Sequence, residues 1–232
     1  MGEVSADPIT LDLLREARET VSSSPLGVIN TPMIPWCQTT LPLDIRCNIH
    51  IKLENMQRTG SFKIRGVANQ FARRPKGGHF VTMSAGNYGK SFTYASKHYG
   101  SKGKVVMPET APVSRSTLIQ VRACTMYRSF IKKKPVGMDT KSIASGLAPP
   151  FAGTLPFELC QRYVEGIVLI NDEEIKAAVS TLYRSGLVVE PSGCTAFAAI
   201  VNDKIPELEG KSVVCILRGE NIGKDELVNF PG

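Results

Sequence analysis

The sequence predicts an α/β fold built on parallel strands. Strand-like apolar runs alternate with amphipathic helical runs over most of the 232 residues, and this alternation is typical of βαβ units. Hydrophobic residues make up 42% of the chain and charged residues 21%, a balance typical of globular proteins. No apolar run approaches the roughly 20 residues of a membrane span, so no membrane association is expected.

The first third of the sequence predicts two helices and one strand. A helix is expected from 10 to 21, capped by Thr10. Residues 49–53 alternate apolar and polar side chains, which predicts a half-buried strand. A turn at 58–60 leads to Ser61, the expected cap of a second helix. Apolar residues recur at helical spacing in that helix: Ile64, Val67, Ala68 and Phe71.

The middle of the chain continues the alternation. Strands are predicted at 80–83 and 104–107, with a tight turn at 84–87 and a helix to about 99. A further helix is expected from Ser114 to about Arg122.

Between 123 and 156 the alternation is lost, and no regular element is predicted there. A helix capped by residues 171–174 follows. A strand at 187–190, a small-residue helix at 194–201 and a buried strand at 212–217 complete the pattern.

Cysteine usage and charge narrow the function classes. The six cysteines include no CxxC pair, which argues against a zinc site and a disulfide framework. Reduced thiols predict a cytoplasmic protein. The net charge is +7, with basic clusters at 73–74 and 132–134. Neither cluster has interleaved aromatic residues, so a solvated face is expected and a nucleic-acid partner is not.

Lys63 is the central candidate for chemistry. In the hexapeptide SFKIRG it stands between Phe62 and the start of an amphipathic helix. A lysine fixed in this way can form a Schiff base with an aldehyde cofactor such as pyridoxal phosphate. The alternative is a surface lysine in a first helical turn, where a cation is mildly unfavourable.

Three loops are further candidates. The turn at 84–87 joins a strand to a helix and directs N–H groups toward an anion, although an ordinary turn has the same residues. Residues 190–193 and 218–221 each follow a predicted strand, and ligands of open α/β sheets bind at such strand ends. Each of these two could also be a plain loop. No P-loop, GxGxxG motif or Ser/His/Asp arrangement is present.

Taken together, these stretches resemble the fold-type II pyridoxal-phosphate enzymes, specifically the group of serine/threonine dehydratases and serine racemases. The resemblance implies an open sheet with helices on both faces, like the tryptophan synthase beta fold. It also implies a large domain at 1–75 and 123–232 and an incomplete small domain at 76–122. The resembling segments are 31–32, 53–66, 84–89, 105–115, 142–148, 171–178, 188–193 and 213–221.

The resemblance also implies residue roles. Lys63 would carry the cofactor and remove the α-proton of the substrate, and Phe62 would pack beside the cofactor ring. Asn87 would hydrogen-bond the 3′-oxygen of the ring. The substrate carboxylate would be held by three residues: Ser84, Ala85 and Gly86. The activity implied is conversion of L-serine or L-threonine to a 2-keto acid and ammonia, by a homodimer if the chain assembles and without a metal.

The chain differs from the racemases of this group at one position and departs from the family pattern in three further places. Ala85 stands where racemases place a second serine, which favours dehydration over racemisation. Tyr88 replaces the usual histidine. Arg218 stands where a serine normally bonds the pyridine nitrogen, and a permanent cation disfavours protonation of that nitrogen. After about Gln120 roughly 80 residues appear missing relative to a family-length domain, including the Gly-rich phosphate loop.

These departures leave three interpretations open. The first is an active pyridoxal-phosphate ammonia-lyase acting on a small amino acid. The second is a non-catalytic truncated or splice-variant member of the same family that acts, if at all, by binding subunits. The third and weakest is a basic nucleic-acid-binding module, which salt-dependent binding to arbitrary DNA would support.

Overall fold

The structure is a computed structural model that describes residues 9–41, 47–84, 86–106, 125–138, 142–227 and 230. The chain divides into two compact units. Unit 1 is Met1–Asn30 with Lys63–Pro108, and unit 2 is Thr31–Phe62 with Glu109–Gly232. These boundaries differ from the domain division expected from the sequence (1–75 with 123–232, and 76–122), which stays a prediction.

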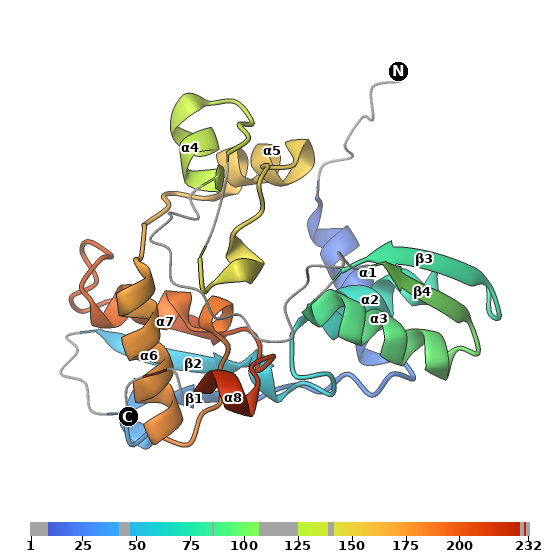
Figure 1. Cartoon of the computed structure of the whole chain (residues 1–232), viewed down its shortest axis with the longest axis horizontal. Coiled ribbons are helices and arrows are strands. Elements are labelled where there is room, and N and C mark those ends of the chain that lie inside the picture. The colour runs from blue at the N-terminus through green and yellow to red at the C-terminus, as the bar shows by residue number, and fades with distance from the viewer. Residues whose placement is uncertain are drawn as a thin grey trace. The chain divides into compact units, whose positions relative to one another are not determined.

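Unit 1 is a two-stranded parallel sheet with helices on one face (Figure 1). Its elements are α1 (Leu11–Ser22), α2 (Lys63–Ala72), β3 (His79–Met83), α3 (Asn87–His98) and β4 (Lys102–Val106). The helices α2 and α3 pack on each other, α3 also packs on β4, and α1 packs on α2. The connection from β3 through α3 to β4 is a βαβ unit, as the alternation predicts.

The core of unit 1 forms around Phe71. Its ring centroid lies 5.6 Å from that of Phe92 and 5.7 Å from that of Phe80, both in edge-to-face geometry. The four residues predicted to face the core from α2 are all buried. Thr10 caps α1 as predicted, because its Oγ1 accepts a hydrogen bond from the Leu13 N–H at 3.2 Å.

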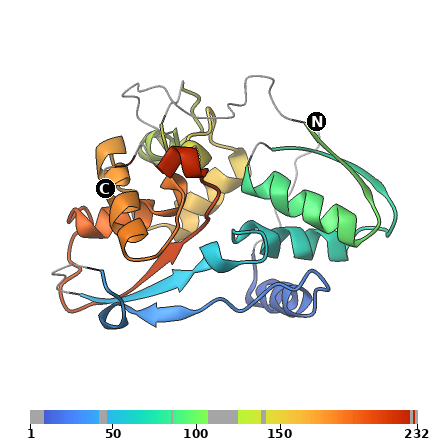
Figure 2. The same cartoon turned by 60° about the horizontal axis from the view of Figure 1, so that its bottom comes forward.

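Unit 2 is built on a three-stranded sheet (Figure 2). The strands are β1 (Met33–Pro35), β2 (Asn48–Leu53) and β5 (Ser212–Leu217), in the order β1-β2-β5. The central strand β2 pairs antiparallel with β1 and parallel with β5. Its alternate residues are buried, as the sequence pattern predicts: Ile49, Ile51 and Leu53.

Five α-helices and four single-turn 3₁₀ helices belong to the described part of unit 2. The α-helices are α4 (Thr125–Lys132), α5 (Thr154–Tyr163), α6 (Asp172–Arg184), α7 (Thr195–Val201) and α8 (Lys224–Leu227). The 3₁₀ helices are η1 (Trp36–Gln38), η2 (Glu54–Met56), η3 (Ser145–Leu147) and η4 (Pro191–Gly193). The helix α6 places its apolar residues in the core with β2 and β5: Ile175, Val179 and Leu182.

Several expectations need correction. The stretch 123–156 is not irregular throughout, since α4 lies within it and α5 begins near its end. Residues 187–190 form no strand. The Glu190 N–H donates to Gly219 O, and Asn55 Nδ2 donates to Val188 O at 3.1 Å. The strand β5 is not buried on both faces, because Val214 and Ile216 are 56% and 46% exposed.

Other expectations are displaced or untested. The second helix begins at Lys63, so Ser61 lies one residue before the cap position and instead bridges to Gly219. The helix predicted at 114–122 lies outside the described residues. Within the described part of the chain, no helix has the length and apolarity needed to cross a membrane.

Candidate functional site

Lys63 is the first residue of α2, and its side chain is exposed. The residue before it, Phe62, is half-buried and belongs to unit 2. The Phe62 N–H donates to Arg218 O at 3.3 Å, just past the last residue of β5. The backbone that carries Lys63 is therefore fastened at the carboxyl end of a parallel strand, where ligands of α/β sheets bind.

Gly60 completes this attachment. The Glu220 N–H donates to Gly60 O at 2.9 Å, and the Gly60 N–H donates to Gln57 O at 2.7 Å. Gly60 has a φ of +70°, and a Cβ there would lie 2.5 Å from Glu220 Oε1. Only glycine meets both demands without strain, which explains the glycine two residues before the aromatic residue.

The side chain of Arg218 points toward its own unit. Its guanidinium donates to Ser192 O, and its backbone N–H donates to Gly193 O at 3.3 Å. Burial lowers the pKa of Arg218, and the nearby Glu190 opposes that shift. The two loops at 190–193 and 218–221 therefore lie together. Only the second follows a strand, because the strand predicted at 187–190 is absent.

Two cysteines near this junction are not nucleophiles. Cys194 and Cys215 are buried, and burial raises the pKa of each thiol to about 12. Thiols with so high a pKa stay protonated at neutral pH, and the thiolate is the reactive form. Burial and protonation therefore both disfavour cysteine chemistry at these two positions.

The turn after β3 in unit 1 is built around Ser84. Its Oγ accepts hydrogen bonds from the Gly86 N–H at 3.3 Å and the Gly89 N–H at 3.0 Å. A Cβ on Gly89 would lie 2.7 Å from Ser84 O, so this close approach needs glycine. Asn87 is the first residue of α3, and the partial positive charge of a helix N-terminus favours an anion there. Ala85 lies outside the described residues.

The predicted site residues thus form two groups. Phe62 and Arg218 meet in unit 2, while Ser84, Gly86 and Asn87 form one turn in unit 1. Lys63 begins the segment of unit 1 that directly follows Phe62. Both helices that begin with a predicted site residue, α2 with Lys63 and α3 with Asn87, pack on each other.

Sequence reasoning missed the polar contacts that support the strand-end loops. The Gly146 N–H donates to Ser192 Oγ at 2.9 Å, so the segment 142–148 is tied to η4. Ser142 Oγ donates to Asp172 Oδ1 at 2.6 Å, at the start of α6. The sequence signals for these contacts are two short motifs that contain Gly and Ser, at 142–148 and 188–193. These motifs indicate which residues matter, but not which residues they contact.

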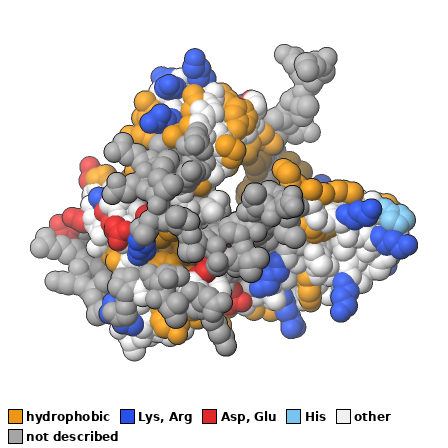
Figure 3. All heavy atoms as spheres, in the orientation of Figure 1, with side chains coloured by type: hydrophobic (Ala, Val, Ile, Leu, Met, Phe, Trp, Pro, Cys, Tyr) orange, Lys and Arg blue, Asp and Glu red, His pale blue; other side chains and the backbone are white. Residues whose placement is uncertain are grey.

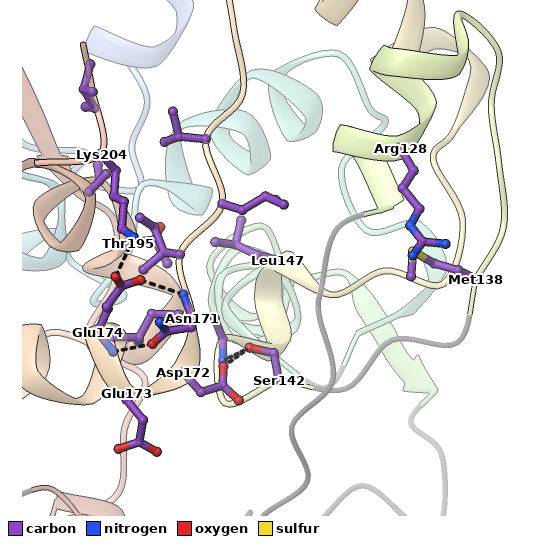
Figure 4. A pocket seen from close by; sticks show the side chains of 18 residues that line it. Arg128, Met138, Ser142, Leu147, Asn171, Asp172, Glu173, Glu174, Thr195 and Lys204 are labelled. Carbon is purple, nitrogen blue, oxygen red and sulfur yellow. Dashed lines mark hydrogen bonds and ion pairs between the residues drawn. The ribbon is translucent and has the colours of Figure 1, made fainter. Parts of the chain in front are cut away.

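A cavity of about 1150 Å³ opens beside these contacts in unit 2 (Figure 4). Its polar side chains pair with one another: Glu174 with Lys204 at 2.9 Å and Ser142 with Asp172. None of the sequence-predicted site residues lines it. Among the described residues, no three histidine, cysteine or acidic side chains gather as metal ligands.

A protein-family model matches most of the chain. The model for "Pyridoxal-phosphate dependent enzyme" matches in two pieces, residues 25–122 and 118–219. The two pieces meet at the point where the sequence loses the family pattern. An internal shortening explains both observations.

The alignment with a curated relative also indicates an internal shortening. L-threonine ammonia-lyase from Thermotoga maritima is 24% identical over 313 residues, covering 92% of this chain and 76% of the relative. Since 92% of 232 residues is about 213, about 100 of the 313 aligned positions hold no residue of this chain. This gap agrees with a segment missing from the family-length fold.

Solved structures share the fold. The processed form of threonine deaminase isoform 2 from Solanum lycopersicum superposes with a TM-score of 0.78 at 20% identity, covering 97% of this chain and 89% of that one. Maize serine racemase superposes with a TM-score of 0.78 at 20% identity, covering 94% and 95%. With the family model matched over most of the chain, the protein belongs to the pyridoxal-phosphate dependent enzymes, with a shortened fold-type II architecture.

Proposed function

We propose that the chain is a pyridoxal-phosphate-dependent ammonia-lyase that converts L-serine or L-threonine to a 2-keto acid and ammonia. The observation that carries this proposal is the placement of Lys63. Its backbone follows directly on a hydrogen bond between Phe62 and Arg218, while its side chain is exposed. A fixed backbone that carries an exposed lysine side chain suits a Schiff-base lysine.

The described residues fit the aldehyde end of the cofactor better than its phosphate end. Lys63 would supply the amine, and Phe62 would supply an apolar ring beside the cofactor, as the resemblance implies. The turn at η4 uses its own donors, because the N–H groups of Gly193 and Cys194 both donate to Glu190 O. That turn therefore offers those donors to its own backbone and not to a phosphate.

The residues of the chain have separate roles in the proposed reaction. When bound, pyridoxal phosphate supplies an aldehyde for the substrate amine and an electron-accepting ring. Lys63 Nζ accepts the α-proton as a general base. Ser84 Oγ accepts two N–H bonds, which leaves its hydroxyl proton to donate, and the substrate carboxylate would be its acceptor. Asn87 would hydrogen-bond the oxygen at the 3′ position of the ring, the role that the family resemblance implies.

The sequence favours elimination over racemisation. Racemisation needs an acid or base on each face of the α-carbon, and Ala85 supplies neither. The substrate then loses its α-proton and β-hydroxyl as one molecule of water. The dehydrated product takes up one water, releases ammonia and becomes the 2-keto acid, so that no net water is consumed.

The gap in the family match favours a second candidate function. About 100 aligned positions are empty, and the sequence has no Gly-rich phosphate loop. Charge-assisted hydrogen bonds contribute roughly 1.5–3 kcal/mol each, so loss of that loop weakens cofactor binding strongly. The second candidate is a non-catalytic family member that binds other subunits of the family.

Borohydride trapping separates the two candidates. The full chain is incubated with pyridoxal phosphate, reduced with sodium borohydride and analysed by peptide mass spectrometry. The proposal expects a pyridoxyl adduct on Lys63 that is absent from Lys63→Ala and retained in Lys90→Ala, an exposed lysine of the same unit. Keto-acid release from serine and threonine is then assayed.

Three results are distinguishable. An adduct on Lys63 with keto-acid release supports the ammonia-lyase. An adduct on Lys63 without turnover leaves a cofactor-binding protein that lacks this activity. A folded chain with no adduct, or with adducts spread over several lysines, excludes the enzyme and leaves the non-catalytic candidate.

A further inference from the structure

One face of the unit 1 sheet is exposed along both strands. The strands β3 and β4 have five residues each and pair in parallel, with His79 opposite Lys102 and Met83 opposite Val106. Phe80 and Val105 turn to the core formed with α2 and α3. The alternate residues turn the other way and are exposed: His79, Val81, Met83, Lys102, Lys104 and Val106.

This exposed face has two chemically different halves. At the carboxyl end of the strands it is apolar, with Val81 68%, Met83 78% and Val106 53% exposed. At the amino end it is basic, because His79 and Lys102 are paired in register and Lys104 lies opposite Val81. Figure 3 shows hydrophobic side chains along this strand region, with lysine or arginine and a histidine beyond them.

A parallel sheet with one bare face is unusual. Such sheets occur almost only where helices cover both faces, and here α2 and α3 cover one of them. An exposed apolar patch rimmed by charges marks an interaction site. The apolar half of this face would lose contact with water if a helix packed on it.

The charge of the face is not neutralised locally. The stretch from 63 to 106 contains nine lysines and arginines and no acidic residue. Within the described residues, neither Lys102 nor Lys104 forms an ion pair. A second copy of this face would bring lysines against lysines, which is unfavourable.

We propose that the β3–β4 face, defined by the six residues above, is a docking surface for an amphipathic helix of a partner protein. The helix has an apolar stripe that packs on Val81, Met83 and Val106, and an acidic end that lies over Lys102 and Lys104. Five strand residues span roughly 17 Å, which corresponds to about 11 residues of helix. The partner segment is therefore about three turns long.

Other occupants match the face less well. A nucleic-acid backbone would contact the basic half but leave the apolar half in water. The segment of this chain that follows β4, residues 107–124, has a single acidic residue, Glu109, and two arginines. Its charge therefore does not complement the basic half. This inference stands independently of the proposed ammonia-lyase activity.

A charge-swap experiment tests the proposal. The probe is a fluorescein-labelled synthetic helical peptide with leucines at helical spacing and three glutamates in one terminal turn. Its binding to the full chain is measured by fluorescence anisotropy. The double variant Lys102→Glu/Lys104→Glu is expected to weaken binding by about tenfold or more, and a peptide with lysines in place of the glutamates is expected to bind this variant better than wild type.

Control variants distinguish an effect of the β3–β4 face from an effect of the net charge of the protein. Lys90→Glu/Lys97→Glu changes the same net charge on exposed positions of α3 and is expected to leave peptide binding unchanged. Val81→Ser/Met83→Ser is expected to weaken binding without changing its salt dependence. Circular dichroism confirms that each variant is folded.

Two results overturn the proposal. In the first, the α3 control weakens peptide binding as much as the β4 variant, which means that only net charge matters. In the second, a labelled single-stranded oligonucleotide binds more tightly than the peptide and depends on Lys102 and Lys104 but not on Val81 and Met83. The face would then be a phosphate-binding surface and not a helix-docking surface.

Discussion

At the scale of single residues, the structure changes the interpretation of Arg218. From the sequence it is a cation in place of a serine, and its direction is open. The structure shows its guanidinium donating to Ser192 O, with Glu190 nearby. Because the donor and acceptor are 26 positions apart, no local pattern could have predicted this contact. The arginine therefore joins the loop that follows β5 to η4 of its own unit.

The contact predicts a stability cost for removing the guanidinium. Arg218→Met keeps much of the side-chain volume but leaves the carbonyl of Ser192 without this donor. An unsatisfied buried acceptor costs about 1–3 kcal/mol, so the free energy of unfolding in urea is expected to fall by that amount. Arg162→Met, at an exposed position of α5, is the matched control and is expected to change little. Equal effects in both variants would contradict a specific role for Arg218.

Gly60 gives a second prediction at this scale. Gly60→Ala forces a Cβ toward Glu220 at a φ of +70°, and the unfolding free energy is expected to fall by about 1–3 kcal/mol. The control is Gly66→Ala in α2, where no atom lies within 4 Å of the added Cβ. That change is expected to stabilise by up to about 1 kcal/mol, because alanine is the better helix former. Chemical denaturation is expected to show a lower unfolding free energy for Gly60→Ala and a higher one for Gly66→Ala.

At the scale of elements, periodic patterns predicted well and irregular ones did not. The strand β2 and the helix α2 bury the residues that alternation and helical spacing select. The helices α4 and α5 escaped prediction because they lie in or beside a stretch rich in Lys, Gly and Pro, and they bury few side chains. Only Thr125, Ser129 and Phe157 are buried in them. They pack mainly on each other, a tertiary contact that no local pattern carries.

The start of α6 predicts a pH dependence. Asn171 and Glu174 form a capping box, and Lys204 lies 2.9 Å from Glu174 Oε1. The hydrogen bond to Lys204, together with that from the Asn171 N–H, holds the pKa of Glu174 below its ordinary value. A lowered folded pKa means that ionised Glu174 stabilises the fold above its unfolded pKa. This contribution is lost as the pH falls below about 4.5 toward the folded pKa.

Comparison with Glu174→Gln isolates this contribution. Near neutral pH the wild-type chain is expected to be the more stable of the two, and the difference is expected to shrink as the pH is lowered. Thermal unfolding followed by circular dichroism at several pH values measures it. A difference that grows on acidification would show that Glu174 is not the group responsible.

At the scale of the whole molecule, short motifs predicted the family, which the family match confirms. They also indicated candidate site residues, but not the contacts that support the candidate site. Lys63, Asn87 and Ser84 lie in contiguous segments that the family match covers. The hydrogen bonds that hold Phe62 at Arg218 and Gly146 at Ser192 join segments far apart in sequence. They depend on the parallel pairing of β2 with β5. The alternation of strands and helices predicted a parallel sheet, but not which strands pair in it.

The shortened architecture also leaves β5 at the edge of its sheet in the described part of unit 2. Its two sides differ sharply: Cys215 and Leu217 are buried, whereas Val214 and Ile216 are 56% and 46% exposed. An apolar edge strand favours pairing with other chains. Association of the purified chain is therefore expected to depend on these two exposed side chains.

Val214→Thr/Ile216→Thr tests this expectation. Threonine keeps the β-branched shape that suits a strand and removes part of the apolar surface. Light scattering at fixed protein concentration is expected to fall, with the unfolding free energy changed by only about 0.5 kcal/mol or less, as for surface substitutions. Cys215→Thr, on the buried side of the same strand, is expected instead to destabilise the fold. If the exposed pair proves as destabilising as Cys215→Thr, both faces of β5 are buried in solution, and another chain covers the face that carries Val214 and Ile216.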